Sequence, residues 1–219
     1  MAGEIELSVI IPTINEAEFL LETLESVSEC NESGLELLVV DGGSCDDTTA
    51  IAHHRGSTVI ASPLCQRAHQ MNLGAANARG NVLLFLHADC RLPPGGIRSI
   101  KHALEDRTVV GGAFARRFDH PSMFLHFTCV LADLRGHVFG LHLGDQGIFV
   151  RRRVYQRIGG FPEWDSFEDL EFSRRMSQQG TVATLGPAIR TSGRRFGPHP
   201  VKRTLRDLML TARYLRDQA

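Results

Sequence analysis

The first 90 residues alternate short apolar runs with segments of helical character. The apolar runs cover residues 7–13, 35–43, 57–62 and 81–89. Continuous apolar runs of this length are typical of strands buried on both faces, as in a parallel sheet. The intervening helical segments cover residues 15–30, 46–55 and 65–80. The alternation predicts an α/β fold built on an open sheet, with Asn15 capping the first helix and Gly80 ending the third.

The second half of the chain is less regular. We expect a helix over 96–106, a strand with a glycine irregularity over 109–118, and a strand followed by a short helix over 147–161. A further helix over 166–180 would take Ser166 as its cap. Residues 122–140 mix aromatic side chains with helix formers, and the tail over 199–218 is amphipathic.

Composition and charge narrow the classes of protein. The 219 residues are 42% hydrophobic and 22% charged, which suits one globular domain with a full core. The net charge of -1 directs the protein neither to nucleic acid nor to an anionic membrane. No apolar run approaches the roughly 20 residues that span a bilayer, and the acidic start leads into a strand, so we expect no transmembrane segment and no signal peptide. Five scattered cysteines without a CxxC pair predict reduced thiols in the cytoplasm.

Polar clusters follow three of the predicted strands. "PTINE" follows the first strand, "DGGSCDDT" the second and "HADC" the fourth. In an open α/β sheet, ligands bind beyond the carboxyl ends of the strands, so these clusters predict a binding site there. A carboxylate such as Asp89 at this edge, beside a phosphate-bearing ligand, would hold a divalent cation, because hard cations take oxygen ligands.

Each cluster also has a purely structural interpretation. The segment from Asp41 to Ser44 would serve as a tight turn into a helix, and Asp89 would cap the turn before Pro93. The occurrence of all three clusters at strand ends, in order and within 90 residues, favours a site.

The motifs together resemble those of an inverting family 2 glycosyltransferase. The resemblance rests on "SVIIPTINEAEFLLETLESV", "LLVVDGGSCDDT", "RAHQMNLGAANARGNVLLFLHADCRL" and "GGFPEWDSFEDLEFSRRM", and covers roughly residues 7–176. "FLHADC", "GDQGIFVRR" and "TSGRRF" further resemble a small bacterial subgroup linked to arsenosugar biosynthesis. The family implies the GT-A fold, a Rossmann-like nucleotide-diphospho-sugar transferase fold with a single mixed, mostly parallel sheet flanked by helices. We therefore expect one domain over 1–219, with a nucleotide-binding half (1–95) and an acceptor half ending in a C-terminal helix (96–219).

The resemblance implies a role for each matching residue. The residues implied at the nucleotide sugar are Pro12, Thr13, Glu16, Asp41, Gly43, Arg67, Gln70 and Asp89. Of these, Asp41 would contact the nucleotide base and Asp89 would bind the metal. Arg67 would lie near the pyrophosphate, with Gln70 beside it. Asp169 would be the base that deprotonates the acceptor, preceded by Glu168 as in the family's "ED" pair. Such a general base acts on the side of the sugar opposite the leaving nucleoside diphosphate. Cations stabilise the negative charge that grows on this leaving group.

The chain departs from the family pattern in two places. His87 stands where the first metal-binding carboxylate often sits, so it would either bind a transition metal such as manganese or hydrogen-bond the sugar. The expected cofactor is Mn²⁺ or Mg²⁺, and His142 and His199 are spare candidates for a late metal ligand. The tail lacks the QxxRW motif of processive members, which favours transfer of one sugar per acceptor.

Two further polar segments are candidates for the cleft. Asp145 and Gln146 precede an apolar strand and are interpreted as sugar or acceptor contacts, or as a turn at the strand start. Arg194 and Arg195 lie in "SGRRFG", which would be a loop that closes over the phosphates or a solvated basic turn.

Other functions and partners stay open at this stage. A sugar nucleotidyltransferase would want a basic, glycine-rich loop after the first strand, and a dinucleotide oxidoreductase a GxGxxG there; "IPTINEAEF" offers neither. A non-catalytic nucleotide-sugar-binding protein is a third alternative. The expected ligands are a UDP or GDP sugar and a hydroxyl acceptor. The tail would pack on the core, form a homodimer or rest on a membrane surface.

Overall fold

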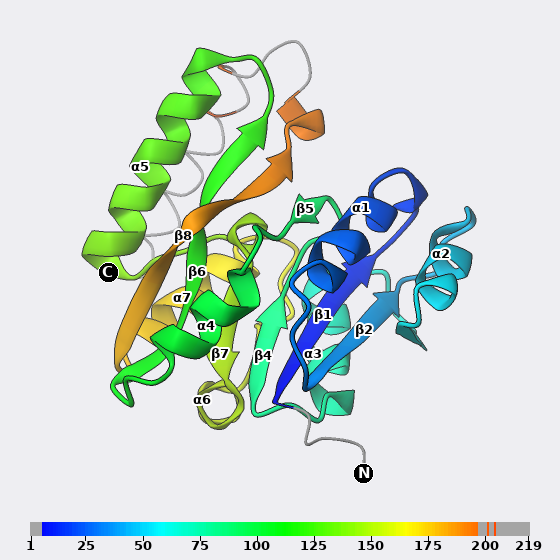
Figure 1. Ribbon diagram of the computed structural model, residues 1–219, viewed down its shortest axis with the longest axis horizontal. Helices are drawn as coiled ribbons and strands as arrows, with labels where there is room; N and C mark the ends of the chain where they lie inside the picture. The colour runs from blue at the N-terminus through cyan, green and yellow to red at the C-terminus, as the bar shows by residue number, and fades with distance from the viewer. Residues whose placement is uncertain (1–5, 197–200, 202–203, 205–219) are drawn as a thin grey trace.

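The computed structural model describes residues 6–196 together with 201 and 204, and it is built on one eight-stranded sheet (Figure 1). The strand order is β3-β2-β1-β4-β7-β6-β8-β5. The strands are β1 (Leu7–Thr13), β2 (Leu35–Asp41), β3 (Thr58–Ala61), β4 (Val82–Phe85), β5 (Cys90–Arg91), β6 (Val109–Asp119), β7 (Ile148–Arg151) and β8 (Thr181–Ser192). The helices are α1 (Ala17–Ser28), α2 (Thr48–His54), α3 (Arg67–Asn77), α4 (Gly96–Ala103), α5 (Met123–Phe139), α6 (Arg152–Ile158) and α7 (Glu168–Ser177), with 3₁₀ turns η1 (Gly144–Gln146) and η2 (Arg194–Phe196).

The sheet is mixed, and its first four strands are parallel. β3, β2, β1 and β4 pair parallel to one another, while β7 pairs antiparallel with both β4 and β6. β6 and β8 are again parallel. The four predicted apolar runs therefore form one parallel block, and the expected mostly parallel sheet is confirmed.

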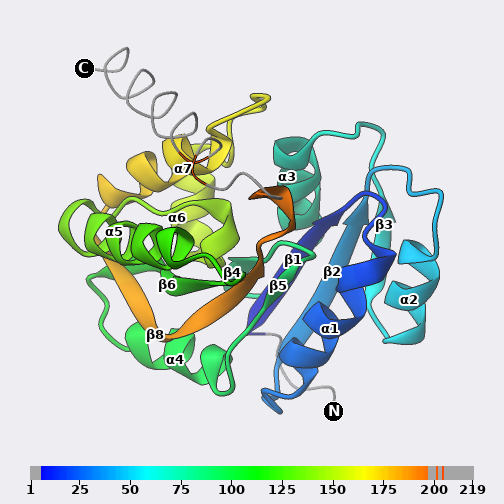
Figure 2. The same ribbon diagram turned by 90° about the horizontal axis from the view of Figure 1, so that it is seen from above.

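Helices cover both faces of the sheet, as Figure 2 shows. All seven residues of β1 are buried. Val9 and Ile11 pack in a cluster with residues of α1 and α4, whereas Ile10 packs in a second cluster with residues of α3, α6 and α7. Because successive strand residues point to opposite faces, a strand covered on both sides must be apolar throughout.

The predicted helix signals at Asn15, Ser166 and Gly80 are wrong. α1 begins after Glu16, because the Asn15 side chain accepts a hydrogen bond from the Cys45 amide at 2.8 Å and so ties two loops together. α7 begins after Phe167, a residue with a φ of +67°, and no side chain caps it. α3 ends at Asn77, and Gly80 lies instead against β1, where a Cβ atom would stand 2.7 Å from the Ser8 nitrogen.

Two long elements of the second half carried no definite prediction. α5 spans the ambiguous residues 122–140, and β8 forms where the sequence assigned no strand. Gly186 and Pro187 interrupt the apolar pattern of β8, and a bulge in its pairing with β6 accommodates the irregularity. The expected C-terminal helix lies outside the described residues. Among the residues that the structure describes, no helix has the length and apolar character needed to cross a membrane.

Candidate active site

The carboxyl ends of β1, β2 and β4 meet at one edge of the sheet. Thr13 pairs with Asp41 across β1 and β2, and Pro12 precedes Thr13 in the buried strand. His87 and Asp89 follow β4, which pairs parallel with β1. The structure thus brings the three predicted polar clusters to the same edge, where ligands of open α/β sheets bind.

The Asp41 carboxylate organises the loop that follows β2. It accepts hydrogen bonds from the amides of Gly43 and Ser44 at 2.9 and 2.8 Å and from the Thr13 hydroxyl at 3.1 Å. Burial alone would raise the pKa of Asp41, but the hydrogen bonds, led by those from Ser44, outweigh it and lower that pKa. Gly43 has a φ of +99°, which few other residues adopt in a turn. Asp41 therefore holds this loop in shape, whatever it contacts in a ligand.

Gln70 forms the floor beneath these strand ends. Its side-chain nitrogen donates to the carbonyls of Thr13 and Val40, both at 2.8 Å, and the residue is buried. The side-chain amide thereby links the backbones of β1 and β2 next to Asp41. The donor capacity of Gln70 is therefore used on the backbone of the strand ends.

Arg194 joins the first and third polar clusters across the sheet edge. Its guanidinium donates to both Glu16 oxygens at 2.7 and 2.6 Å and to Asp89 Oδ2 at 3.2 Å. The same guanidinium lies 4.4 Å from the centre of the Phe19 ring. The predicted basic loop after β8 thus contacts two predicted site residues. The side chain of Arg195 lies outside what the structure describes.

One set of side chains at this edge has the spacing of a metal site. The ligand atoms of His87, Asp89 and Cys90 all lie within 4.8 Å of one another. Burial, followed by the charge of Asp89, raises the pKa of the Cys90 thiol well above its usual range, so it is protonated at neutral pH. An imidazole and a carboxylate then remain as donors. The carboxylate suits Mn²⁺ or Mg²⁺ beside phosphate oxygens, whereas the imidazole suits a transition metal such as Mn²⁺. The sequence prediction had passed over Cys90.

Gly144 brings the end of β4 and the start of α7 together. Its amide donates to Asp169 Oδ2 at 2.7 Å. A Cβ atom at this position would stand 2.6 Å from His87 Nε2 and 3.4 Å from Asp169 Oδ2. Only a glycine lets the two side chains approach the same backbone atom. The predicted base and the predicted metal-site histidine are therefore neighbours.

Glu168 lies beside Asp169 in a more buried environment. Its carboxylate is 3.4 Å from Arg67, which lies at the start of α3. Burial, and then the charge of Asp169, raises the pKa of Glu168, while Arg67 opposes that shift. Asp169 is half-buried and Glu168 is buried, so the two adjacent carboxyl groups have different access to solvent.

Asp145 lies behind the site in a buried ion pair. Its carboxylate accepts two hydrogen bonds from Arg116 Nη1, at 2.7 and 2.6 Å. The neighbouring Gln146 accepts from Arg135 Nη2 at 3.2 Å and from the Leu143 amide at 3.0 Å. Arg116 and Arg135 are site-supporting residues that the sequence analysis missed, because arginines on a strand and a helix carry no motif of their own.

Of the two spare histidines, His142 is described, and it is not one of the three residues with metal-site spacing. His142 is buried, and its Nε2 lies 2.9 Å from the Thr184 hydroxyl. Burial, with a further effect of Arg135, lowers the pKa of His142 to about 4, which keeps the ring neutral at physiological pH. His199 lies outside the described residues.

The comparisons with known proteins agree with this arrangement. The sequence model of "Glycosyl transferase family 2" matches residues 8–159. A Mycobacterium bovis (strain BCG / Pasteur 1173P2) "PGL/p-HBAD biosynthesis glycosyltransferase" is 39% identical over 199 residues, which cover 81% of this chain and 72% of the relative. A Sodalis glossinidius "Undecaprenyl-phosphate 4-deoxy-4-formamido-L-arabinose transferase" is 34% identical over 164 residues, covering 69% of this chain and 49% of the relative. The chain thus spans about half the length of that second relative.

Solved structures share the fold at low sequence identity. A mannosyltransferase from Pyrobaculum calidifontis, in complex with GDP-Man and Mn²⁺, has a TM-score of 0.72 at 22% identity and covers 87% of this chain and 57% of its own. Residues 1–349 of S. aureus TarS, in complex with UDP, give a TM-score of 0.70 at 17% identity, covering 85% of this chain and 60% of theirs. These likenesses confirm the GT-A fold that the sequence predicts.

Proposed function

The chain belongs to glycosyl transferase family 2, and on that premise we propose that it transfers one sugar from a nucleoside diphosphate sugar to an acceptor hydroxyl, with inversion. The observation that carries the proposal is the junction at Gly144. There the end of β4, which belongs to the nucleotide side of the sheet, meets the predicted base Asp169 at the start of α7. A donor held at one side of this junction would present its sugar to an acceptor held at the other.

The donor would lie along the edge formed by β1, β2 and β4. The loop shaped by Asp41 and Gly43, closed below by Gln70, would take the nucleoside, with Pro12 and Thr13 as its wall. Asp89 and His87 would hold Mn²⁺ or Mg²⁺, which when bound neutralises negative charge on the diphosphate. The Pyrobaculum mannosyltransferase binds GDP-Man with Mn²⁺ and TarS binds UDP, so both GDP and UDP sugars are candidate donors.

Arg194 would meet the leaving group. Its guanidinium is engaged by Glu16 and Asp89, whose carboxylates attract cations to the place where the diphosphate would lie. A guanidinium donates two parallel hydrogen bonds to phosphate as readily as to carboxylate. We assign it the role of stabilising the charge that grows on the nucleoside diphosphate as the bond to the sugar breaks.

Asp169 would accept the proton of the acceptor hydroxyl. Its Oδ2 accepts one hydrogen bond from the Gly144 amide and its Oδ1 one from the Leu170 amide, at 2.7 Å each. A carboxylate offers about four acceptor positions, so each oxygen keeps room for a further donor. The two amides fix the direction of the carboxylate, which is what a general base needs before the acceptor arrives.

Glu168 would hold the start of α7 in place, and with it the adjacent base Asp169. Its carboxylate is buried and directed to Arg67, and this ion pair links α7 to α3. Because Arg67 is engaged by Glu168, we place it near the pyrophosphate but do not assign it a direct contact with the ligand. Asp145, through Arg116, would brace η1, from which the Gly144 amide is presented.

We place the reaction in the cytoplasm on the basis of the five free cysteines, two of which are exposed. The direct test of the proposed function is a donor screen. Purified protein is incubated with UDP and GDP sugars and candidate hydroxyl acceptors, with Mn²⁺, Mg²⁺ or excess chelator, and release of the nucleoside diphosphate is measured. Acceptor-dependent release that stops in chelator supports the proposal. Nucleotide binding without release from any donor would instead indicate a non-catalytic nucleotide-sugar-binding protein.

A further inference from the structure

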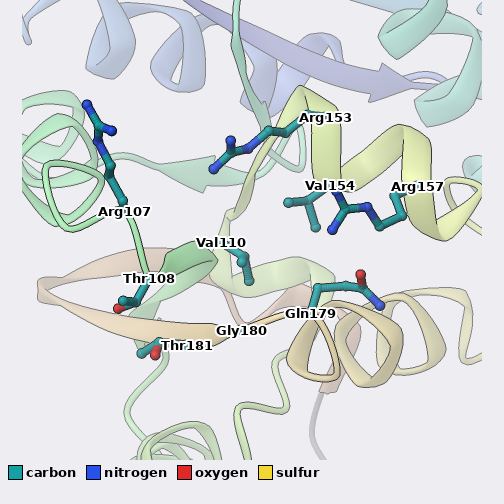
Figure 3. A pocket seen from close by; sticks show the side chains of 9 residues that line it. All are labelled: Arg107, Thr108, Val110, Arg153, Val154, Arg157, Gln179, Gly180 and Thr181. Atoms are coloured by element: carbon teal, nitrogen blue, oxygen red, sulfur yellow. The ribbon is translucent and has the colours of Figure 1, made fainter.

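A pocket lies at the edge of the sheet opposite the candidate active site. It has a volume of about 380 Å³ and is lined from three directions: by the loop before β6, by α6, and by the turn between α7 and β8 (Figure 3). β7 runs antiparallel to β4, so Arg151 at its end pairs with Val82 at the start of β4. The pocket at the start of α6 is therefore separated from His87 and Asp89 by the length of β4.

Three arginines line this pocket, and among the residues that the structure describes no carboxylate does. Arg153 and Arg157 stand one turn apart on α6, and Arg107 comes from the loop before β6. Figure 3 shows Arg107 on one side and the two α6 arginines on the other, with Val110 between them. Residues four apart on a helix lie on the same face, so Arg153 and Arg157 act on the same side of the pocket.

Within the described part of the chain, the neighbouring arginines are engaged by other groups, whereas these three are not. Arg151 donates to the carbonyls of Val109 and Leu104 at 2.8 and 2.6 Å, and Arg152 donates to Gly80 at 2.7 Å. In the described part of the chain, the side chains of Arg107, Arg153 and Arg157 have no hydrogen-bond or ion-pair partner. Three uncompensated guanidinium groups around one hollow make a strongly positive site.

Among the described residues, the two acids that precede Arg107 in the chain form no ion pair with the three arginines. Asp106 directs its Oδ1 to the amide and hydroxyl of Thr108, both at 2.8 Å, and Glu105 lies 3.1 Å from His102. The positive field also reaches Arg151: burial, and then the charges of Arg153 and Arg107, lower the pKa of Arg151, with Asp106 only partly opposing them.

The walls of the pocket are fixed before any ligand binds. The Thr181 amide donates to the Thr108 carbonyl at 3.0 Å, which ties the turn before β8 to the loop before β6. Gly180 has a φ of +155°, and a Cβ atom there would stand 2.6 Å from Val110 Cγ1. On the other side, Val154 anchors α6 in the core.

From this geometry we propose that the arginine pocket, defined by Arg107, Arg153 and Arg157, binds a phosphate-bearing anion at a site separate from the active site. Guanidinium groups match phosphate oxygens in pairs, and three of them suit a group with at least two negative charges, such as a diphosphate or a phosphomonoester. That chemistry is shared by soluble phosphorylated compounds and by the headgroups of anionic lipids.

The probe for the soluble source is pyrophosphate, titrated calorimetrically into the protein in chelator and low salt. Arg153→Gln with Arg157→Gln should weaken binding at least about tenfold, since hydrogen bonds between charged groups are lost. The matched control is Arg55→Gln with Arg98→Gln, which removes the same charge from surface pairs with Glu25 and Glu32 and should leave binding unchanged.

The probe for the lipid source is co-sedimentation with vesicles of phosphatidylglycerol and phosphatidylcholine, compared with phosphatidylcholine alone. If the α6 double variant, but not the control, loses binding to anionic vesicles, the ligand is a lipid headgroup. If the double variant loses only pyrophosphate binding, the ligand is a soluble phosphorylated compound. The proposal is overturned if the wild type binds neither probe, or if the α6 double variant and the wild type bind both alike. Binding of UDP and GDP with Mn²⁺ should be unchanged in the double variant, which separates this test from that of the proposed function.

Discussion

The guanidinium of Arg194 contacts Asp89 and Glu16 at the same time, through hydrogen bonds of 3.2 Å to the first and 2.6–2.7 Å to the second. These two acids follow different strands, and the arginine comes from the far end of β8, 105 residues beyond Asp89. The loop that carries Arg194 is therefore held over the sheet edge by the residues proposed to receive the donor.

Replacing Arg194 by Gln should weaken binding of UDP or GDP in the presence of Mn²⁺ by about tenfold or more, because a charged donor to the diphosphate is lost. Calorimetric titration of the nucleotide measures this directly. Arg190→Gln is the control, since Arg190 is an exposed arginine near the end of β8 that lies 3.3 Å from Asp119. Equal affinities for wild type and Arg194→Gln would remove this residue from the donor site.

The Asp41 carboxylate should make the stability of the folded protein depend on pH. Because the hydrogen bonds it accepts lower its pKa below the ordinary 3.8, the folded protein is stabilised at pH values above that point and loses this stabilisation as the pH falls through the lowered pKa. Asp41→Asn should cost about 1–3 kcal/mol of unfolding free energy at pH 7, and less below pH 3.8. Urea unfolding at several pH values measures the difference. A cost that does not diminish in acid would mean that the carboxylate charge is not what holds the loop.

Gly144 should tolerate no side chain. Its backbone permits alanine, but the new Cβ would press on His87 Nε2 and crowd Asp169. We expect Gly144→Ala to lower kcat by about 10²-fold, as displacements near 1 Å at reacting groups do. Gly95→Ala is the control, because it strains a residue with a φ of +72° where a Cβ meets nothing within 4 Å. If both variants keep normal kcat, the junction at Gly144 is not part of the site.

His142 should make the protein sensitive to mild acid. Its pKa falls from 6.5 to about 4 in the folded state, so the unfolded chain takes up a proton that the folded chain refuses as the pH drops between these values. The wild type should lose up to about 3 kcal/mol over this range from that group. His142→Gln should flatten the dependence measured by urea unfolding between pH 7 and 4, while exposed His102→Gln should not. Parallel curves for the wild type and His142→Gln would contradict the burial argument.

The sequence predicts the first half of the fold better than the second. In β1, β2 and β4 local pattern and tertiary environment agree, because strands covered on both faces must be apolar throughout. β8 was missed because its stability comes from pairing with β6 rather than from its own residues, and Gly186 and Pro187 disturb its pattern.

The site shows the same division. The residues at strand ends, such as Asp41 and Asp89, could be found because topology alone brings strand ends together. The contacts between the two halves could not be predicted in this way. Gly144 precedes β7 and has no side-chain group that would mark it. Arg116 and Arg135 meet Asp145 and Gln146 only after β6 and α5 have folded. Such long-range pairs leave no local trace in one sequence.

The central claim is that Asp169 is the base and Glu168 its buried neighbour. Its most direct test is the comparison of kcat and donor affinity for Asp169→Asn and Glu168→Gln, once a donor and acceptor pair is established. Asp169→Asn keeps the shape and loses the basicity, so kcat should fall at least about 10²-fold while donor affinity changes little. Glu168→Gln should keep most of the rate, because the side chain faces Arg67 rather than the acceptor. Near-normal kcat in Asp169→Asn, with the loss found instead in Glu168→Gln, would contradict the account.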